Sequence, residues 1–112
     1  MNAETLAPQK PETAKGAIGA RKIRFFLIDP HAEQVCVAGS FNNWNPTITP
    51  MTRENRGRWT KELMLRPGRY EYQFVINGHW KPDPAAKETV LNPFGGINSV
   101  LTVSAVNGNG NG

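Results

Sequence analysis

The sequence predicts an all-β domain, and three observations lead to this expectation. Turn-forming residues are frequent, with 11 Gly and 9 Pro among 112 residues. Short runs rich in β-branched and aromatic residues lie between the turns. The pair Asn77-Gly78 is a strong hairpin signal, because both central positions of a type I′ turn need φ > 0. The length suits one domain and is too short for two.

The two ends of the chain differ in composition from its middle. Residues 1–19 are rich in Ala, Pro, Glu, Thr and Lys without a sustained apolar period, so they cannot bury enough surface to offset the entropy of ordering. The stretch 105–112 is mainly alternating Asn and Gly. We therefore expect a flexible arm over 1–19, one folded domain over 20–104 and a flexible tail over 105–112.

The first half of the domain contains two predicted strands. Residues 23–28 alternate in the manner of a strand until Pro30 interrupts them. Residues 34–41 form a second β-rich run. This run ends in 42–46, where three Asn and one Pro disfavour a continuing strand. Trp44 is therefore predicted on a loop.

The second half contains three further predicted strands. In 59–65, Trp59 has the same parity as two leucines, so we expect its ring in the core. The turn 66–68 leads into a strand over 69–76, whose aromatic residues share one face. The segment 98–103 closes the domain.

The hairpin also predicts where Trp80 lies. With 77–78 as the turn, Trp80 opposes Val75, and directly opposed residues point to the same face of the sheet. That face also carries Glu71 and Gln73, whereas the aromatic side chains of the strand lie on the other face. We expect Trp80 on the outer, more polar side, where an exposed indole indicates a binding surface.

Charge and targeting signals restrict the partners. The net charge of +4 suits a nucleic-acid binder only if the basic residues cluster, and along the sequence they are scattered. Aromatic residues on a basic β surface leave single-stranded nucleic acid as a rival that salt dependence would identify. Residues 1–20 hold no apolar segment of a signal peptide or membrane span, and the single Cys36 cannot form an internal disulfide. We expect a cytoplasmic protein that binds neither nucleic acid nor membranes.

Two interpretations of Trp44 are open. Its ring could fold back to cap the core, or its flat face could stack on a sugar whose axial C–H bonds point at the π cloud. Asn42, Asn43 and Asn45 supply uncharged donors and acceptors for hydroxyl groups. Asn42 or Asn43 could instead hold the turn through Asx hydrogen bonds.

Catalysis and metal binding find little support. Hydrolysis of a glycosidic bond needs two carboxylates about 5 to 9.5 Å apart across the substrate. The acidic pair nearest Trp80, Asp83 and Glu88, is expected to cap turns around the neighbouring prolines. His31 and His79 lie far apart without an acid–base partner, and two His with one Cys show no metal-ligand spacing. We expect no enzymatic activity, no metal and no cofactor.

Three segments together carry a family likeness. They are GSFNNW at 39–44, PGRYEYQF at 67–74 and NGHW at 77–80. In this order they resemble carbohydrate-binding module family 48, which includes the glycogen-binding domain of the AMP-activated protein kinase β subunit. The family also includes the early-set domain at the N-terminus of isoamylases and glycogen branching enzymes. The likeness runs from about residue 21 to residue 103.

The resemblance implies an immunoglobulin-like, early-set β-sandwich that binds α-1,4-linked glucan such as glycogen or starch. Trp44 and Trp80 match the two tryptophans that grip the chain. Gln73 stands where the kinase domain has Lys, so hydrogen bonding is kept and the positive charge is lost. In the late loop, Phe94 matches an apolar sugar contact and Asn98 matches an amide.

The partners implied are an α-glucan polysaccharide or oligosaccharide and, as a second class, a glycogen-metabolising enzyme. The alternative is a module of the same fold that has lost sugar binding and docks on a glycogen-metabolising enzyme or kinase, which it regulates or localises. Gln73 favours this alternative, and so does Gly96, which lacks the hydroxyl of the family's Thr. A glycan array without binding would support it.

Overall fold

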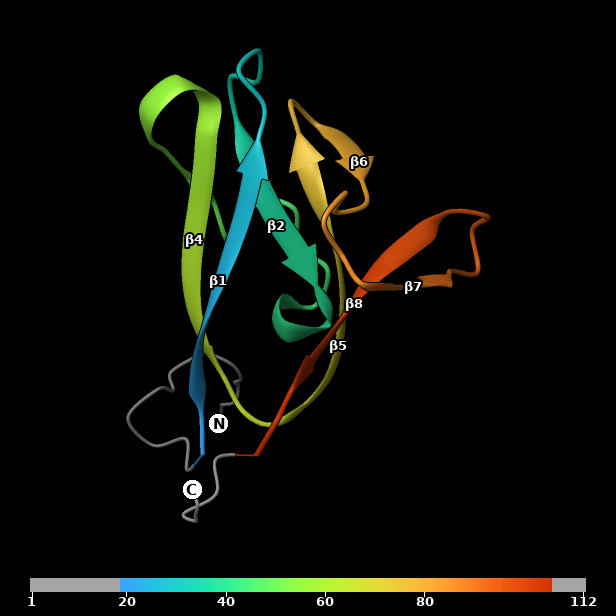
Figure 1. The fold of residues 1–112 in the computed structure, drawn as a ribbon. Coiled ribbons are helices and arrows are strands. Elements are labelled where there is room, and N and C mark those ends of the chain that lie inside the picture. The colour runs from blue at the N-terminus through green and yellow to red at the C-terminus, as the bar shows by residue number, and fades with distance from the viewer. Residues whose placement is uncertain (1–18, 106–112) are drawn as a thin grey trace, which may run out of the picture.

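Runs of extended backbone separated by turns give eight strands in residues 19–105, the part of the chain that the computed structural model describes (Figure 1). The strands are β1 (Arg21–Ile28), β2 (Val35–Gly39), β3 (Thr52–Arg53), β4 (Arg58–Leu65), β5 (Gly68–Ile76), β6 (His79–Lys81), β7 (Glu88–Leu91) and β8 (Ile97–Val103). Two 3₁₀ turns, η3 (Ser40–Asn42) and η4 (Asn55–Gly57), lie between them. The predicted arm and tail fall outside the described residues apart from Gly19 and Ala105, so both stay predictions.

The strands form two antiparallel sheets that pack face to face. One sheet has the order β1-β4-β3, and the other has the order β2-β5-β8-β7 with β6 paired to the end of β5. Both tryptophan-bearing registers are regular: Leu27 lies opposite Trp59, and Val75 lies opposite Trp80. The chain is therefore all-β, with the immunoglobulin-like sandwich that the sequence predicted.

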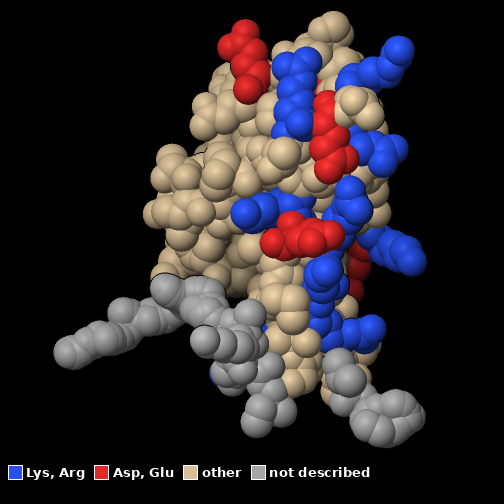
Figure 2. All heavy atoms as spheres, turned by 90° about the vertical axis from the view of Figure 1, so that its left-hand side faces the viewer, with Lys and Arg blue, Asp and Glu red and all other residues tan. Residues whose placement is uncertain are grey.

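Charge is divided unevenly between the two sheets. Among residues 19–105, the segments 21–28 and 52–65 of the β1-β4-β3 sheet carry seven Lys and Arg against two Glu. The remaining described residues carry four Lys and Arg against five Asp and Glu. Figure 2, which faces the side of β4, shows the basic side chains gathered there with few acidic ones between them. The expectation of scattered charge is wrong, because strand pairing brings the basic segments 21–28 and 52–65 into one sheet.

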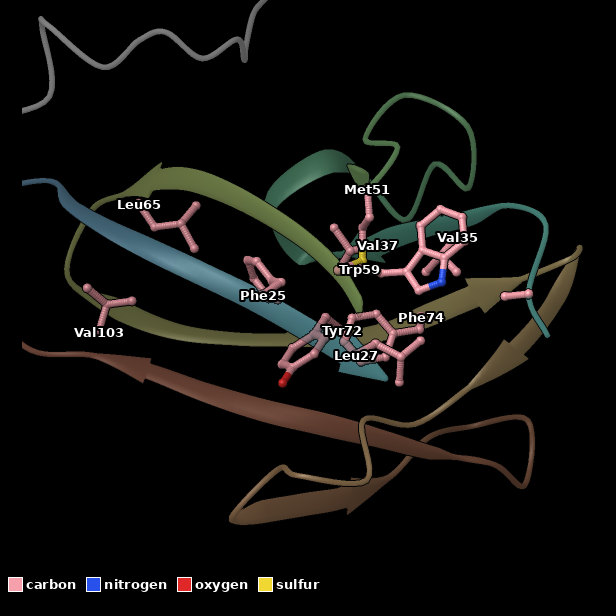
Figure 3. Close-up of a cluster of buried hydrophobic side chains, with 11 residues drawn as sticks. Phe25, Leu27, Val35, Val37, Met51, Trp59, Leu65, Tyr72, Phe74 and Val103 are labelled. Atoms are coloured by element: carbon pink, nitrogen blue, oxygen red, sulfur yellow. The ribbon is translucent and has the colours of Figure 1, made fainter. Parts of the chain in front are cut away.

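The core lies between the sheets and combines four aromatic side chains with seven aliphatic or Met side chains (Figure 3). Phe25 from β1 meets Tyr72 from β5 edge-on, with ring centroids 5.1 Å apart. Phe74 has no exposed surface, and burial of such a side chain stabilises the fold by about 1.5–3 kcal/mol. Trp59 is buried as predicted, and its indole N–H donates to the Asp29 carbonyl at 3.1 Å.

The predicted hairpin at Asn77-Gly78 is confirmed. Both residues have positive φ, 51° and 84°, and the register places Ile76 opposite His79. The Asn77 side chain has a second role, because its Oδ1 accepts the backbone N–H groups of Glu33 and Gln34. The turn therefore also fixes the segment that leads into β2.

Two strands were not predicted, β3 and β7. Both are short, with two and four residues, so their pairing depends on neighbours distant in sequence rather than on a local pattern. Glu88 begins β7 and pairs with Val100, so the expectation that it caps a turn is wrong. Asp83 does cap a turn, because its Oδ1 accepts the Ala85 N–H at 2.8 Å.

The other carboxylate oxygen of Asp83 reaches the core. It accepts the hydroxyl hydrogen of Tyr72 at 2.6 Å, while the Asp83 backbone N–H donates to Ser99 Oγ at 2.8 Å. Burial and this hydrogen bond raise the pKa of Tyr72 far above its usual range. Asp83 is therefore a structural residue that ties the segment after β6 to the sandwich.

Within residues 19–105, the structure contains no helix long and apolar enough to cross a bilayer. It also brings together no group of three or more His, Cys, Asp or Glu side chains in that range that could hold a metal ion.

Candidate functional site

The outer side of the β2-β5-β8-β7 sheet carries an open cavity of about 760 Å³. It lies on the side of β5 that does not face the core, and two loops, 43–51 and 92–96, contribute to its walls. The lining residues are Trp44, Glu71, Gln73, Trp80, Asn92, Pro93, Phe94, Gly96 and Asn98. All five residues expected to bind sugar from the sequence, Trp44, Trp80, Gln73, Phe94 and Asn98, are among them.

A left-handed turn after β2 positions Trp44. Asn43 and Trp44 have φ values of 58° and 57°, and the Trp44 backbone N–H donates to the Gly39 carbonyl at 2.9 Å. Positive φ is uncommon for a residue as bulky as Trp, so its surroundings must enforce it. Close packing at Gly39 contributes, since a Cβ added there would lie 2.5 Å from the Glu71 carbonyl oxygen.

Asn42 holds this turn closed. Its Oδ1 accepts the Gly39 N–H at 3.0 Å, and its Nδ2 donates to the Val37 carbonyl and to Thr49 Oγ1. Asn45 likewise accepts the Thr47 N–H at 2.9 Å. Neither side chain lines the cavity, so these amides serve the loop and the interpretation as Asx-type turns is the correct one.

Trp44 does not cap the core between the sheets, and its stacking on a sugar stays a prediction. Its ring is half-buried against a second apolar cluster of Cys36, Ala38 and Val75 on the outer side of the sheet. The rest of the residue lines the cavity beside Trp80, which is 44% exposed. The two indole centroids lie 6.4 Å apart, and the ring planes are inclined by 39°. Neither ring is in the core between the sheets, and both face the same cavity.

A network of amides and one carboxylate forms the polar part of the cavity. Asn98 is its centre: its Oδ1 accepts from Gln73 Nε2 at 2.9 Å and from Asn92 Nδ2 at 3.1 Å, and its Nδ2 donates to Glu71 Oε1 at 3.0 Å. Gln73 and Asn98 are nearly buried, at 9% and 6% exposure. Buried polar groups that satisfy one another in this way keep fixed positions.

Glu71 is a cavity residue that the sequence reasoning placed on the correct face but did not name as a site. Hydrogen bonds from the Asn98 amide and from Arg69, whose Nη1 lies 2.7 Å from Oε2, lower the pKa of the carboxyl. The charge of the Arg69 guanidinium acts in the same direction, against partial desolvation. Glu71 is therefore ionised at neutral pH. Its parity with Gln73 was the signal that could have identified it.

Asn92 is the second missed residue. Its Oδ1 accepts the backbone N–H groups of Phe94 and Gly96, both at 2.9 Å, and this holds the turn between β7 and β8. Phe94 at the tip is 93% exposed, beside Gly95 with a φ of +86°. Asn92 thus links the loop that carries Phe94 to the amide network. No local sequence pattern predicts that link.

Comparison with known proteins points to one family. Residues 25–108 match the family model described as the glycogen recognition site of AMP-activated protein kinase. Protein FLOURY ENDOSPERM 6, chloroplastic, of Oryza sativa subsp. japonica is 31% identical over 93 residues, which cover 83% of this chain and 17% of the rice protein.

Two further relatives are named as a branching enzyme and as a kinase subunit. The 1,4-alpha-glucan branching enzyme GlgB 2 of Xanthomonas campestris is 37% identical over 78 residues, covering 63% of this chain and 10% of the enzyme. The 5'-AMP-activated protein kinase subunit beta-1 of Sus scrofa is 32% identical over 71 residues, covering 63% of this chain and 55% of that sequence. The chain therefore spans less than a fifth of the rice and bacterial relatives.

Proposed function

The chain belongs to the family of the glycogen recognition site of AMP-activated protein kinase, and on this premise we propose that it is a non-catalytic module that binds α-1,4-linked glucan, such as glycogen or starch, by stacking on Trp44 and Trp80. One observation carries the proposal: two accessible indoles lie 6.4 Å apart on the rim of a single cavity. This spacing is comparable with the width of a sugar ring. Flat apolar faces beside hydrogen-bonding groups suit a pyranose, whose C–H bonds stack while its hydroxyls need partners.

The amide network supplies hydrogen-bonding partners for the hydroxyl groups of the sugar. Gln73 uses one of its N–H bonds for Asn98, and its remaining donor and acceptor capacity is available for a hydroxyl group. Asn98 is held by three hydrogen bonds, so a ligand would meet it already oriented. Preorganised groups lose less entropy on binding than mobile ones. In this proposal Gln73 and Asn98 bind sugar hydroxyls.

Phe94 supplies the third apolar contact of the proposed site. Its side chain is almost fully exposed at the tip of the β7–β8 hairpin and also lines the cavity. Burying such a ring against a ligand would remove apolar surface from water, which favours binding by about 25 cal/mol per Å². Asn92 and Asn98 tie the hairpin to the polar network, so the loop position is compatible with a formed site.

The chemistry of the cavity supports binding without catalysis. Among its lining residues Glu71 is the single carboxylate, and Asn98 and Arg69 hold it. Glycosidic hydrolysis requires a second carboxylate across the scissile bond. Relatives named as a branching enzyme and as a kinase subunit extend well beyond this region, so we propose that the domain over 20–104 acts with a glycogen-metabolising enzyme. A cytoplasmic location stays a prediction, since the rice relative is chloroplastic by name.

Titration with maltoheptaose or β-cyclodextrin, followed by tryptophan fluorescence, tests the proposal. We expect a saturable change with a dissociation constant in the micromolar to millimolar range, or roughly −8 to −4 kcal/mol, because an open cavity leaves much of the ligand in water. Trp44→Ala and Trp80→Ala should each abolish retention on amylose while the far-ultraviolet circular dichroism is preserved.

Phe26→Ala is the matched control, since it removes an exposed aromatic ring from the opposite side of the sandwich. It should bind amylose as the wild-type chain does. Wild-type retention by both tryptophan variants would refute the site. A folded wild-type chain that binds no glucan would replace the proposal with the docking module that has lost sugar binding.

A further inference from the structure

The outer side of the β1-β4-β3 sheet faces away from the cavity, and Glu54 from the segment after β3 contacts Arg24 and Thr60 there. Residues of β1 with even numbers point outward there, because Phe25 and Leu27 point into the core. The register with β4 adds their directly opposed partners. We call this surface the basic face and define it by Lys22, Arg24, Phe26, Ile28, Arg58, Thr60, Glu62 and Met64.

Large apolar side chains are exposed at both ends of the basic face. Phe26 and Ile28 lie two residues apart on β1 and are 39% and 54% exposed, and Met64 near the other end of β4 is 44% exposed. Single exposed apolar residues need no explanation. Three on the outer side of one sheet, separated by cations, match the composition of protein interfaces, which are enriched in Phe, Met and Arg.

The positive charge of this face is only weakly neutralised. Lys22 lies 3.9 Å from Glu62, and Arg24 lies 3.7 Å from Glu54, with all four side chains more than 40% exposed. Such surface pairs contribute about 0–1 kcal/mol and exchange readily with another anion. The Arg58 guanidinium lies over the Phe26 ring at 5.1 Å from its centroid, which orients the cation without cancelling its charge.

We propose that the basic face is a docking surface for an acidic protein segment that carries apolar side chains among its carboxylates. Lys22, Arg24 and Arg58, which outnumber the neighbouring Glu54 and Glu62, supply the charge complementarity. Phe26, Ile28 and Met64 supply the apolar contacts. This function is separate from the proposed glucan site, because the two surfaces lie on opposite outer sides of the sandwich. Both ligands can be bound at once.

Two other anionic partners fit the face less well. Single-stranded nucleic acid needs successive aromatic platforms, and Phe26 is the one exposed aromatic ring among the eight residues of the basic face. Glu54 and Glu62 also lie among the cations, where they would repel a continuous phosphate backbone or an anionic lipid surface. A protein segment can place its carboxylates between those glutamates.

The test titrates the full chain, labelled for nuclear magnetic resonance, with a short peptide of Asp, Glu, Leu and Phe. Its comparison ligands are the same peptide with Asn and Gln in place of the acids, single-stranded DNA, and vesicles of phosphatidylserine and phosphatidylcholine. We expect the acidic peptide to bind most tightly and to shift the signals of Phe26, Ile28 and Met64. The indole signals of Trp44 and Trp80 should stay unchanged, although β-cyclodextrin should shift them.

Charge reversal provides the decisive variant. The double variant Arg24→Glu with Arg58→Glu should weaken acidic-peptide binding by about tenfold or more. The control, Arg66→Glu with Lys87→Glu, changes the net charge by the same amount on exposed residues outside the basic face. It should change the affinity for the peptide less than about twofold. Equal losses in the two double variants would overturn the proposal. So would tighter binding of DNA or vesicles than of the peptide, or a peptide titration that leaves the basic face unshifted.

Discussion

The two outer faces of the sandwich show how one strand pattern yields surfaces of opposite kind. On β5 and β8 the outward positions hold Gln73 and Asn98, which are nearly buried because flanking loops form a cavity above them. On β1 and β4 most outward positions stay in solvent, and the cations among them have only exposed glutamates as ion-pair partners. The difference lies in the loops and not in the strands. A buried polar pair on the outer face of a sheet therefore indicates that flanking loops form a cavity above it.

Removal of the shared core should abolish both faces together. Phe74→Ala takes a fully buried ring from between the sheets, and we expect a loss of about 3–5 kcal/mol in the free energy of unfolding. Chemical denaturation followed by circular dichroism measures it. Ile48→Ala, at a 59% exposed position, is the control and should cost less than about 0.5 kcal/mol. A stable Phe74→Ala chain would show that the faces do not depend on one core.

Asn42→Ala should damage one face and spare the other. It removes three hydrogen bonds that close the Trp44 turn, and we expect a loss of about 1–3 kcal/mol in stability together with weaker glucan binding. Glucan titration at a temperature where the variant is folded separates the two effects. Acidic-peptide binding should be unchanged. Unaltered glucan affinity would mean that the turn does not position the indole.

Salt should distinguish the two faces without any mutation. Between about 50 mM and about 500 mM NaCl the Debye length falls several-fold, so acidic-peptide binding should weaken several-fold while neutral glucan binding changes less than about twofold. Isothermal titration at each salt concentration makes the comparison. Glucan binding that falls as steeply as peptide binding would contradict the assignment of the ligands to separate faces.

Acid should have the smallest effect, and only on the cavity side. The pKa of Glu71 is lowered in the folded chain, so its stabilising contribution is complete above the ordinary carboxyl pKa of about 4.3. This contribution is lost as the pH falls through the lowered value. Glu71→Gln should remove that part of the acid dependence from thermal unfolding curves measured between neutral pH and about pH 3. If thermal unfolding of Glu71→Gln keeps the same dependence on acid pH, the ionised carboxylate does not stabilise the fold through its hydrogen bond with Asn98.

Local patterns predicted the parts of this molecule that depend on near neighbours in the sequence. The Asn77-Gly78 turn fixed the register of β5 with β6, and that register placed Trp80 on the outer side as expected. Parity placed Trp59 in the core. The family likeness named five residues that the structure brings into one cavity, although their binding of sugar remains a prediction.

Features that depend on distant pairing could not be predicted in this way. Glu88 entered a strand because β8 provides a partner, and Asn92 joined the amide network across six residues of hairpin. The placement of Arg24 and Arg58 on one face required knowledge of which strands share a sheet. Turn chemistry was also ambiguous for Asn42, whose three partners are visible only after the chain folds.

The 39° inclination between the two indoles means that the two rings do not lie in one plane. A curling polymer can present successive units to both planes, whereas a straight ribbon such as cellulose can lie flush against only one. The shape of the glucan chain, in addition to the hydrogen bonds of its hydroxyl groups, would then determine which linkage is bound. Cello-oligosaccharides should accordingly bind more weakly than malto-oligosaccharides of equal length.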